Sequence, residues 1–189
     1  MKDHPKPLYE QAHDWLLPAL QPGATAIDAT CGNGYDTLFL CRTLGSGSNV
    51  VGIDIQEDAI RRTGELLKEN GFRAILRQAD HAEMDQSFEK MQIKSIDAAI
   101  LNLGYLPHGD HTITTQCAST LHALRSIVGM ASNSFRLSIV AYRGHPGGAT
   151  EEDAVRSYFQ LLTSGPYQLK ITESRNIETG PVFLGIAYQ

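Results

Sequence analysis

The chain has 189 residues, of which 42% are hydrophobic and 20% are charged, and its formal net charge is −5. These values predict one globular domain over residues 1–189 and exclude a disordered chain and a uniformly basic nucleic-acid-binding protein, although a local basic patch stays open. No stretch has the length of a membrane span and the N-terminus lacks the apolar core of a signal peptide, so we expect a cytoplasmic protein with no membrane partner.

An N-terminal segment, residues 1–22, precedes the first predicted strand and carries apolar residues at helical spacing. These residues are Leu8, Ala12, Trp15, Leu16 and Leu20. The spacing predicts a helix whose apolar face packs on the rest of the chain. A lid over a ligand cavity is the second interpretation, and both stay open.

Apolar runs alternate with amphipathic stretches from residue 24 onward. The predicted strands are 24–29, 49–55, 73–79, 95–102, 135–142, 167–175 and 181–188, and the predicted helices are 35–44, 57–70, 82–91, 114–132 and 151–163. This alternation predicts an α/β, Rossmann-like, doubly wound sheet of seven mostly parallel strands. The segment 176–180 is too short for a helix, so the last two strands must pair as a hairpin and the C-terminal strand runs antiparallel.

Two local signals predict helix ends. The segment Thr150-Glu151-Glu152-Asp153 resembles a capping box and predicts the start of the helix over 151–163. The pair Asn70-Gly71 predicts a left-handed exit from the helix over 57–70.

The first predicted strand ends in a loop, Asp28-Ala-Thr-Cys-Gly32-Asn33-Gly34, where doubly wound sheets bind ligands. Gly32 and Gly34 let the backbone approach a ligand, and N–H groups of the following helix can hold a negative group. A dinucleotide site needs a third glycine, but Thr37 stands at that position. The Asp28 carboxylate would repel a pyrophosphate and suits a phosphate-free ligand with a positive charge. S-adenosylmethionine, with an α-ammonium, a carboxylate and a sulfonium, has this chemistry.

Acidic residues also end the second and third predicted strands. Asp54 lies about 20 residues after the glycines, where an acid accepts hydrogen bonds from both ribose hydroxyls. Asp80, followed by His81, is placed to meet the edge of an adenine. A single Asp at a strand end is commonly a turn residue. Three acids at the ends of successive strands, together with the glycine loop, predict an S-adenosylmethionine site.

The fourth predicted strand ends in Asn102-Leu-Gly-Tyr105-Leu-Pro107, at the usual place of an acceptor site in such a sheet. Methyl transfer depends mainly on positioning, and an amine acceptor needs carbonyl oxygens around its N–H bonds. Asn102 supplies an amide carbonyl, and Tyr105 offers a flat face for stacking on a base. We therefore interpret Asn102 and Tyr105 as catalytic residues, with a tight turn as the alternative for Asn102 and Pro107.

Polar residues of two loops are candidates for substrate binding. They are Pro107, His108, Asp110, Tyr142, Arg143 and His145. A histidine titrates near neutral pH, so His108 or His145, like Asp110, is a candidate for relaying a proton. The segment 108–111 lacks the geometry of a zinc motif, so no metal is predicted. The three cysteines show no partner pattern and are predicted to be reduced packing residues.

Five segments together resemble a known family. They are DATCGNGYDTLFL, VVGIDIQ, Asp80-His81, NLGYLPHGDH and YRGHPGG. They resemble the small class I methyltransferases long labelled "putative rRNA methylases", members of which are associated with methylation of tRNA 5-aminomethyl-uridine at the wobble base. The glycine loop is generic to S-adenosylmethionine enzymes, whereas NLGYLPHGDH is specific to the family. The resemblance runs from about residue 24 to the C-terminus.

The resemblance implies methylation of the exocyclic amine of 5-aminomethyl-2-thiouridine in the anticodon arm of tRNA. The cofactor residues that it implies are Asp28, Gly32, Asn33, Gly34, Asp54, Gln56, Asp80 and His81. It also implies that Asn102 and Tyr105 meet the amine and the base. NLGY lacks both prolines of the Asn-Pro-Pro-Tyr pattern of amino-group methyltransferases, so the geometry of the carbonyls is not fixed by the pattern.

Other functions remain alternatives at this point. An rRNA or small-molecule methyltransferase would use the same chemistry. A nicotinamide-dependent oxidoreductase would use the same fold, although the missing third glycine counts against it, and a non-catalytic nucleotide-binding module would bind without turnover. The sequence leaves open whether the protein is a monomer or a homodimer.

Overall fold

The computed structural model describes residues 6–45, 49–176 and 178–189. The first five residues of the predicted N-terminal segment lie outside this part of the chain. The strands are β1 (Thr25–Asp28), β2 (Asn49–Asp54), β3 (Ile75–Gln78), β4 (Ile96–Leu103), β5 (Ala131–Ala141), β6 (Tyr167–Glu173) and β7 (Val182–Tyr188). The helices are α1 (Leu8–Leu16), α2 (Tyr35–Leu44), α3 (Glu57–Glu69), α4 (Met84–Lys90), α5 (Cys117–Gly129) and α6 (Gly148–Leu162), with short 3-10 turns η1 (Leu17–Ala19) and η2 (His81–Glu83).

The strands form one seven-stranded sheet in the order β3-β2-β1-β4-β5-β7-β6. β1 pairs in parallel with β2 and β4, and the parallel pairing continues outward to β3 and β5. β7 lies between β5 and β6 and is antiparallel to both. The order reverses at β1 and β4, so their carboxyl ends leave a crevice between divergent crossovers. The predicted doubly wound sheet with an antiparallel C-terminal strand is confirmed.

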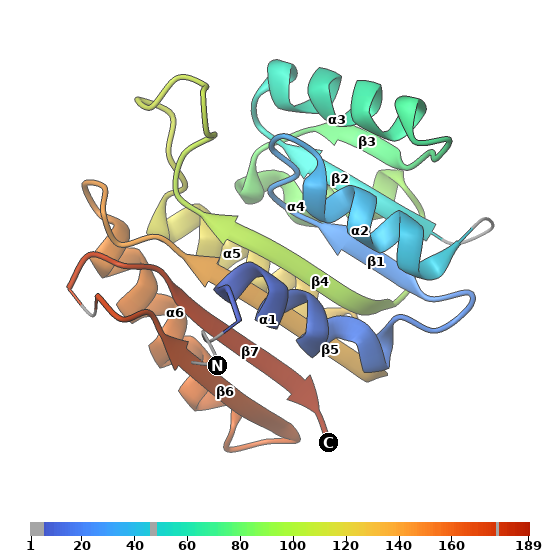
Figure 1. Cartoon of the computed structure of the whole chain (residues 1–189). Coiled ribbons are helices and arrows are strands. Elements are labelled where there is room, and N and C mark those ends of the chain that lie inside the picture. The colour runs from blue at the N-terminus through green and yellow to red at the C-terminus, as the bar shows by residue number, and fades with distance from the viewer. Residues whose placement is uncertain (1–5, 46–48, 177) are drawn as a thin grey trace, which may run out of the picture.

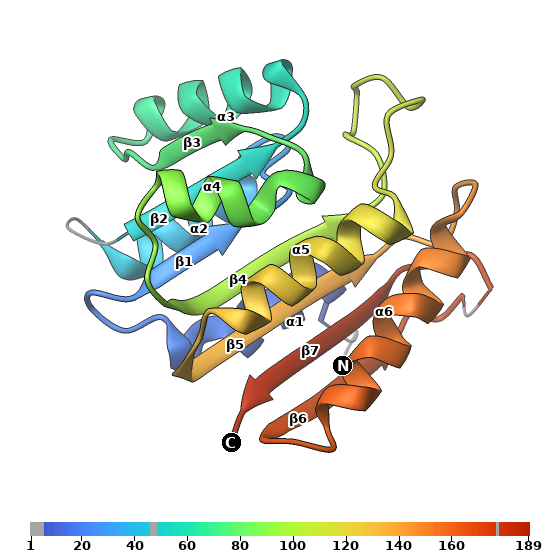
Figure 2. The ribbon, with the colours of Figure 1, turned by 180° about the vertical axis from the view of Figure 1, so that it is seen from behind.

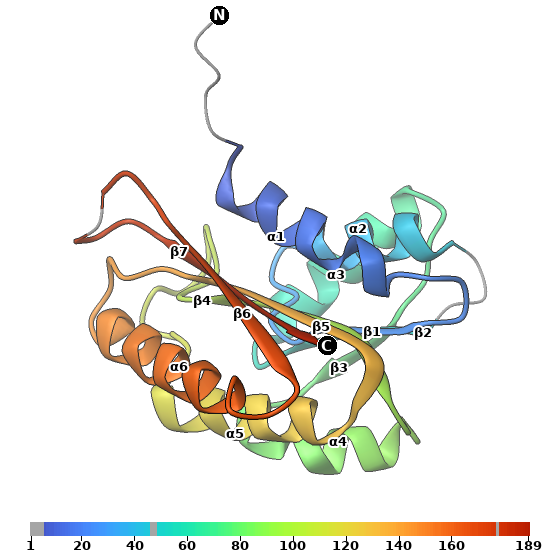
Figure 3. The same ribbon diagram turned by 90° about the horizontal axis from the view of Figure 1, so that it is seen from below.

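Helices cover both faces of the sheet. Figure 3 shows α1, α2 and α3 on one face and α4, α5 and α6 on the other, and Figures 1 and 2 show these two faces in turn. Each layer buries apolar side chains against the strands, with Leu38 and Leu67 on the first face and Phe88 and Phe159 on the second. Along the part of the chain described above, no helix is both long and apolar enough to cross a membrane.

The N-terminal helix α1 packs on the sheet through Trp15. The indole Nε1 donates to the carbonyl oxygens of Leu137 in β5 at 3.1 Å and Ile186 in β7 at 3.3 Å. Gly185 makes room for the ring, since a Cβ there would lie 2.8 Å from the indole atom Cε2. The predicted packing role of this segment is therefore confirmed for its described residues.

Two helices differ from the sequence predictions in their boundaries. α6 begins at Gly148, with Gly147 as its N-cap at φ +85°, so Thr150 lies inside the first turn and the predicted capping box is wrong. The helix starts earlier because the Glu151 N–H already donates to the carbonyl oxygen of Gly147 at 2.9 Å. α5 begins only at Cys117 because Thr114 first pairs with Tyr105 in a β-bridge, and it ends at Gly129 rather than at residue 132 because β5 already pairs with β4 from Ala131. The exit from α3 agrees with its prediction, because Gly71 has φ +76°.

Candidate active site

A cavity of about 740 Å³ opens at the carboxyl ends of the parallel strands. Loops that follow β1, β2, β3, β4 and β5 all contribute to its wall. The predicted residues that line it are Gly32, Asn33, Asp54, Gln56, Asp80, His81, Asn102, Tyr105, Pro107, Tyr142 and His145. The predicted residues that do not line it are Asp28, Gly34, His108, Asp110 and Arg143.

The glycine loop between β1 and α2 is fixed by contacts with the end of β2, with α3 and with the loop after β4. Gly32 N–H donates to the Asp54 carboxylate at 3.0 Å. The Asn33 side chain donates from Nδ2 to the carbonyl oxygen of Pro107 and accepts at Oδ1 from the guanidinium of Arg62. Gly34 has φ +86°, and a Cβ there would lie 2.9 Å from the Cα of Thr63. Gly34 therefore serves close packing of the loop on α3, whereas Gly32 and Asn33 face the cavity.

Asp28 is fully buried beneath this loop. Its carboxylate accepts a hydrogen bond from the Thr37 hydroxyl at 2.6 Å and one from the Thr30 N–H at 3.2 Å. Burial raises the pKa of the Asp28 carboxyl, and the nearby charge of Asp36 raises it further. The prediction that Asp28 contacts a ligand needs correction, because its side chain ties β1 to α2 and is sealed from the cavity.

Asp54 stands at the end of β2 with its carboxylate at the cavity wall. One oxygen accepts from Gly32 N–H and the other from Gln56 N–H at 2.9 Å. The Ile55 backbone also hydrogen-bonds this carboxylate, and because a carboxylate has about four lone-pair sites, a hydroxyl donor can still bind. Burial raises the pKa of Asp54, while these backbone hydrogen bonds oppose that rise. Such a pre-oriented acid fits a vicinal diol.

Asp80 and His81 follow β3 and line the same side of the cavity. The Asp80 carboxylate caps η2 by accepting from Ala82 N–H at 2.8 Å. His81 Nε2 lies 2.8 Å from the carbonyl oxygen of Ala29, which can only accept, so this nitrogen is the protonated donor. The ring thus joins the β1 and β3 loops and forms part of the wall.

Asn102 lies across the cavity from these residues, near the end of β4. Its backbone N–H donates to the Thr30 hydroxyl at 2.7 Å, and its side-chain Nδ2 donates to Asp36 at 2.6 Å. Asp36 was not among the sequence candidates. The available signal was its place in the first turn of a helix beside the glycine loop, where a carboxylate is favoured by the helix dipole.

The loop between β4 and α5 forms one rim and stands out from the body of the molecule (Figures 1 and 2). Tyr105 is 43% exposed and stacks on His111 with 4.1 Å between ring centroids. His108 and Asp110 lie further out on this loop, and Asp110 accepts from Thr112 rather than from a cavity group. Contacts of His108 and Asp110 with a larger substrate therefore stay predictions.

Glu151, in the first turn of α6, holds the loop between β4 and α5 in place. Glu151 is 2% exposed and accepts from the hydroxyls of Thr115 at 2.7 Å and Thr120 at 2.6 Å, while Thr115 in turn accepts from Gly104 N–H. This chain of contacts connects the loop after β4 with α5 and α6. The position of the acceptor loop thus depends on a residue that lies outside the cavity.

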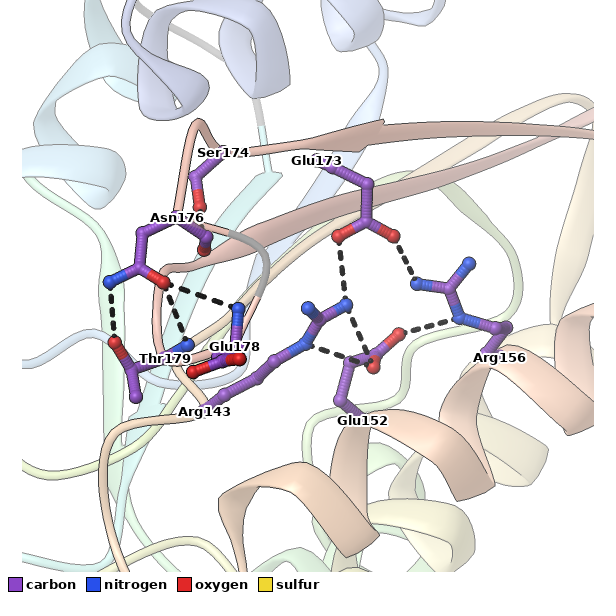
Figure 4. A network of polar contacts seen from close by, with 8 residues as sticks. All are labelled: Arg143, Glu152, Arg156, Glu173, Ser174, Asn176, Glu178 and Thr179. Carbon is purple, nitrogen blue, oxygen red and sulfur yellow. Dashed lines mark hydrogen bonds and ion pairs between the residues drawn. The ribbon is translucent and has the colours of Figure 1, made fainter.

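Arg143 belongs to an ion-pair network that includes Glu152, the residue after Glu151 in α6. Figure 4 shows the guanidinium of Arg143 between Glu152 and Glu173, with Arg156 joining the same two acids. Arg143 is 10% exposed and does not line the cavity. The prediction that it contacts the acceptor needs correction, because the carboxylate of Glu152, 3.1 Å away, draws it into the fold.

The cavity wall contains acids and no fixed positive charge. Among the lining residues, all of which belong to the described ranges, three are aspartates and none is lysine or arginine. The lining acids are Asp36, Asp54 and Asp80. Cys31 also lines the cavity, but burial raises the pKa of its thiol, so it is a poor nucleophile. Within these ranges no group of three or more metal-binding side chains is arranged to hold an ion.

The helix α1 also reaches the cavity, because Tyr9 lines it and His13 contacts Asp36. The packing and lid interpretations of the N-terminal segment are therefore compatible. Trp15 anchors one end of the helix to the sheet, while Tyr9 lines the cavity and His13 contacts the lining residue Asp36.

The strand order and the position of the cavity define the fold of the class I methyltransferases. A crystal structure of a "putative methyltransferase" from Streptococcus mutans in complex with SAH is 34% identical, covers 98% of this chain and 100% of that chain, and superposes with a TM-score of 0.85. The structure of a "putative rRNA-methylase" from Clostridium thermocellum is 30% identical, covers 98% of this chain and 100% of that chain, and has a TM-score of 0.90.

Residues 50–187 match the family model "Putative rRNA methylase", and the chain belongs to this family. A chloroplastic tRNA (mnm(5)s(2)U34)-methyltransferase of Arabidopsis thaliana is 35% identical over an alignment of 161 residues, and the match covers 79% of this chain. The matched segment covers 57% of that relative, so this chain spans little more than half of its length.

Proposed function

We propose that this chain is an S-adenosylmethionine-dependent N-methyltransferase that acts on the aminomethyl group of 5-aminomethyl-(2-thio)uridine at the wobble position of tRNA. The observation that carries the proposal is the cavity itself. It brings a glycine loop and three acids together with Asn102 and Tyr105, without a fixed positive charge. The tRNA relative of Arabidopsis supports the choice of nucleoside, and a cytoplasmic location goes with this substrate.

The cavity fits S-adenosylmethionine better than a dinucleotide. Asp54 presents oxygens with free lone pairs to a ribose, and Gly32 leaves the loop backbone accessible. The lining acids favour a cationic ligand and disfavour a pyrophosphate, for which no lysine or arginine lines the wall. When bound, S-adenosylmethionine supplies a methyl group on a positively charged sulfur.

The residues around the acceptor would act by positioning. The amine must be neutral to attack, so its excess proton leaves before transfer; the N–C bond then forms as the C–S bond breaks and the electron pair goes to sulfur. Asn102 Oδ1 accepts a hydrogen bond from the amine and stabilises the positive charge that develops on nitrogen. Tyr105, exposed at the rim and stacked on His111, offers a platform for the base.

The test is transfer of labelled methyl from S-adenosylmethionine to tRNA that lacks the modification, followed by nucleoside mass spectrometry. Label should appear in the wobble nucleoside. Incorporation only into rRNA or protein would contradict the proposed substrate. Binding of S-adenosylmethionine without transfer to any acceptor would favour a non-catalytic module.

Two substitutions should separate the two halves of the site. Asp54→Ala should weaken S-adenosylmethionine binding by about tenfold or more, because it removes the acceptor of the ribose hydroxyls. Asn102→Ala should lower kcat by about a hundredfold while affinity for S-adenosylmethionine is retained. Calorimetry and single-turnover rates measure the two effects. Parallel loss of binding and rate in both variants would argue against separate roles.

A further inference from the structure

Asp36 links the N-terminal helix to the candidate acceptor site. One carboxylate oxygen lies 2.6 Å from Nε2 of His13 in α1, and the other accepts from Nδ2 of Asn102 in β4 at 2.6 Å. The Asp36 side chain is 16% exposed and the residue lines the cavity. Three elements distant in sequence therefore meet at one carboxylate beside the proposed acceptor residue.

The chemistry of the carboxylate decides which way the Asn102 amide points. An ionised carboxylate only accepts hydrogen bonds, so the amide must turn its NH₂ group toward Asp36. The carbonyl oxygen Oδ1 is then the amide atom left for the cavity. With the amide reversed, two acceptor oxygens would face one another at hydrogen-bonding distance, which is unfavourable.

His13 holds Asp36 from the opposite side. Its ring is 20% exposed and stacks on Phe39 with 3.8 Å between centroids and 2° between planes. This stacking holds the His13 ring against Phe39 of α2. The Asp36 carboxylate is then held between His13 in α1 and Asn102 in β4. The orientation of Asp36 is therefore set by the fold before any ligand binds.

Resting on the proposed function, we propose that Asp36, held by His13, is a positioning residue for methyl transfer. It fixes the amide of Asn102 so that Oδ1 faces the cavity and accepts a hydrogen bond from the acceptor amine. NLGY lacks the two prolines of the Asn-Pro-Pro-Tyr pattern. In this chain the contact with Asp36 sets the direction of the Asn102 carbonyl in their place.

A double-mutant cycle tests whether Asp36 acts through Asn102. Asp36→Leu and Asn102→Ala should each lower kcat about a hundredfold on tRNA that lacks the methyl group. The double variant should be no slower than Asn102→Ala alone, because the amide that Asp36 orients is already absent. S-adenosylmethionine affinity should stay within about threefold in all three variants, which a general disruption of the cavity would not allow. Asp36→Ala replaces Asp36→Leu in the cycle if the leucine variant does not fold.

Variants of His13 give an independent measurement. His13→Gln keeps a side-chain N–H donor for the carboxylate and should retain most of the wild-type rate, whereas His13→Leu should lose about tenfold. Asp14→Asn is the control for α1, since it removes a polar contact of the same helix at an exposed residue paired with Lys6. Equal rates for His13→Gln and His13→Leu would overturn the role of His13.

The outcomes distinguish this inference from the proposed function. If the wild-type protein methylates the tRNA nucleoside but the two losses of the cycle multiply to about ten-thousandfold, Asp36 acts independently and the inference fails alone. If the wild-type protein binds S-adenosylmethionine and transfers methyl to no aminomethyl nucleoside, the proposed function fails and the inference fails with it.

Discussion

Two acids that flank the glycine loop have different chemical roles in this protein because their burial differs. Asp28 is buried under the glycine loop, whereas Asp36 lines the cavity wall, as does Asp54 at the end of the next strand. Sequence proximity to the glycines favours Asp28 and Asp36 equally. Only the packing of Thr37 against Asp28 separates the structural acid from those that face a ligand.

The buried Asp28 should make the stability of the protein depend on pH. Its pKa is raised in the folded state, so the folded protein holds the proton above about pH 4, where the unfolded chain releases it. The Asp28 contribution to the free energy of unfolding therefore falls as pH rises from about 4 toward the raised pKa. Asp28→Asn removes this dependence, and its stability relative to wild type should increase by about 1–3 kcal/mol between pH 5 and pH 8.

Urea unfolding at a series of pH values measures this difference. Asp14→Asn serves as the control, because Asp14 is half exposed in a surface ion pair. If Asp28→Asn and the wild-type protein showed the same slope of stability against pH, Asp28 would have to be ionised in the folded state.

At the scale of elements, Trp15 holds α1 to the sheet together with the buried Ala12 and Leu16. Gly185 in β7 leaves the space that the ring of Trp15 fills, and a Cβ at that position would lie 2.8 Å from the indole. Gly185→Ala should therefore lower the free energy of unfolding by about 1–3 kcal/mol and displace α1. Trp15 is the only tryptophan of the chain, so its fluorescence reports the displacement directly.

A glycine in a helix provides the matched control. A Cβ at Gly129, the last residue of α5, would meet nothing within 4 Å. Gly129→Ala should be neutral or stabilise the protein by up to about 1 kcal/mol, because alanine restricts the unfolded chain. Unchanged Trp15 emission and stability in Gly185→Ala would mean that α1 adjusts without cost.

The first turn of α6 should control the acceptor loop through Glu151. Glu151→Gln keeps one acceptor oxygen but puts an NH₂ donor in place of the other, so the hydroxyl proton of Thr115 or Thr120 loses its acceptor, which costs about 1–3 kcal/mol for a buried group. The rate of methyl transfer should fall more than the affinity for S-adenosylmethionine. Glu152→Gln, in the adjacent ion-pair network of Figure 4, is the comparison. A loss of stability without a loss of rate would show that the loop is placed by other contacts.

The sheet could be predicted from sequence, whereas the supports of the site could not. Alternation of apolar and amphipathic segments predicts a doubly wound, mostly parallel sheet with right-handed crossovers, and the short 176–180 segment predicts the hairpin. The contacts of Asp36 with His13 and of Glu151 with Thr115 join segments 23 and 36 residues apart. No local pattern encodes such pairs, and the acids in α6 resembled a helix cap until the structure showed them buried.

For the whole molecule, the net charge of −5 and the acids of the cavity both favour cationic over anionic ligands. Asp54 ends β2 and Asp80 follows β3, both in one half of the sheet, and Asp36 lies in the first turn of α2. The cations Arg143 and Arg156 form ion pairs with Glu152 and Glu173 and do not line the cavity. We therefore expect the cavity to favour ligands without phosphate. Such a preference would distinguish a methyltransferase from an oxidoreductase built on a similar sheet.

Ligand-linked thermal stability tests this selectivity on the intact protein. S-adenosylmethionine at about 100 times its Kd should stabilise the fold by about 2.7 kcal/mol, which corresponds to a rise in Tm of roughly 5–10 °C for a chain of this size. A nicotinamide dinucleotide should change Tm by less than about 1 °C, because its pyrophosphate meets aspartates and no lysine or arginine at the wall. Asp54→Ala should abolish most of the first shift. An equal shift with the dinucleotide would mean that the acids are neutralised on binding, and the assignment of the cavity to a sulfonium ligand would then be wrong.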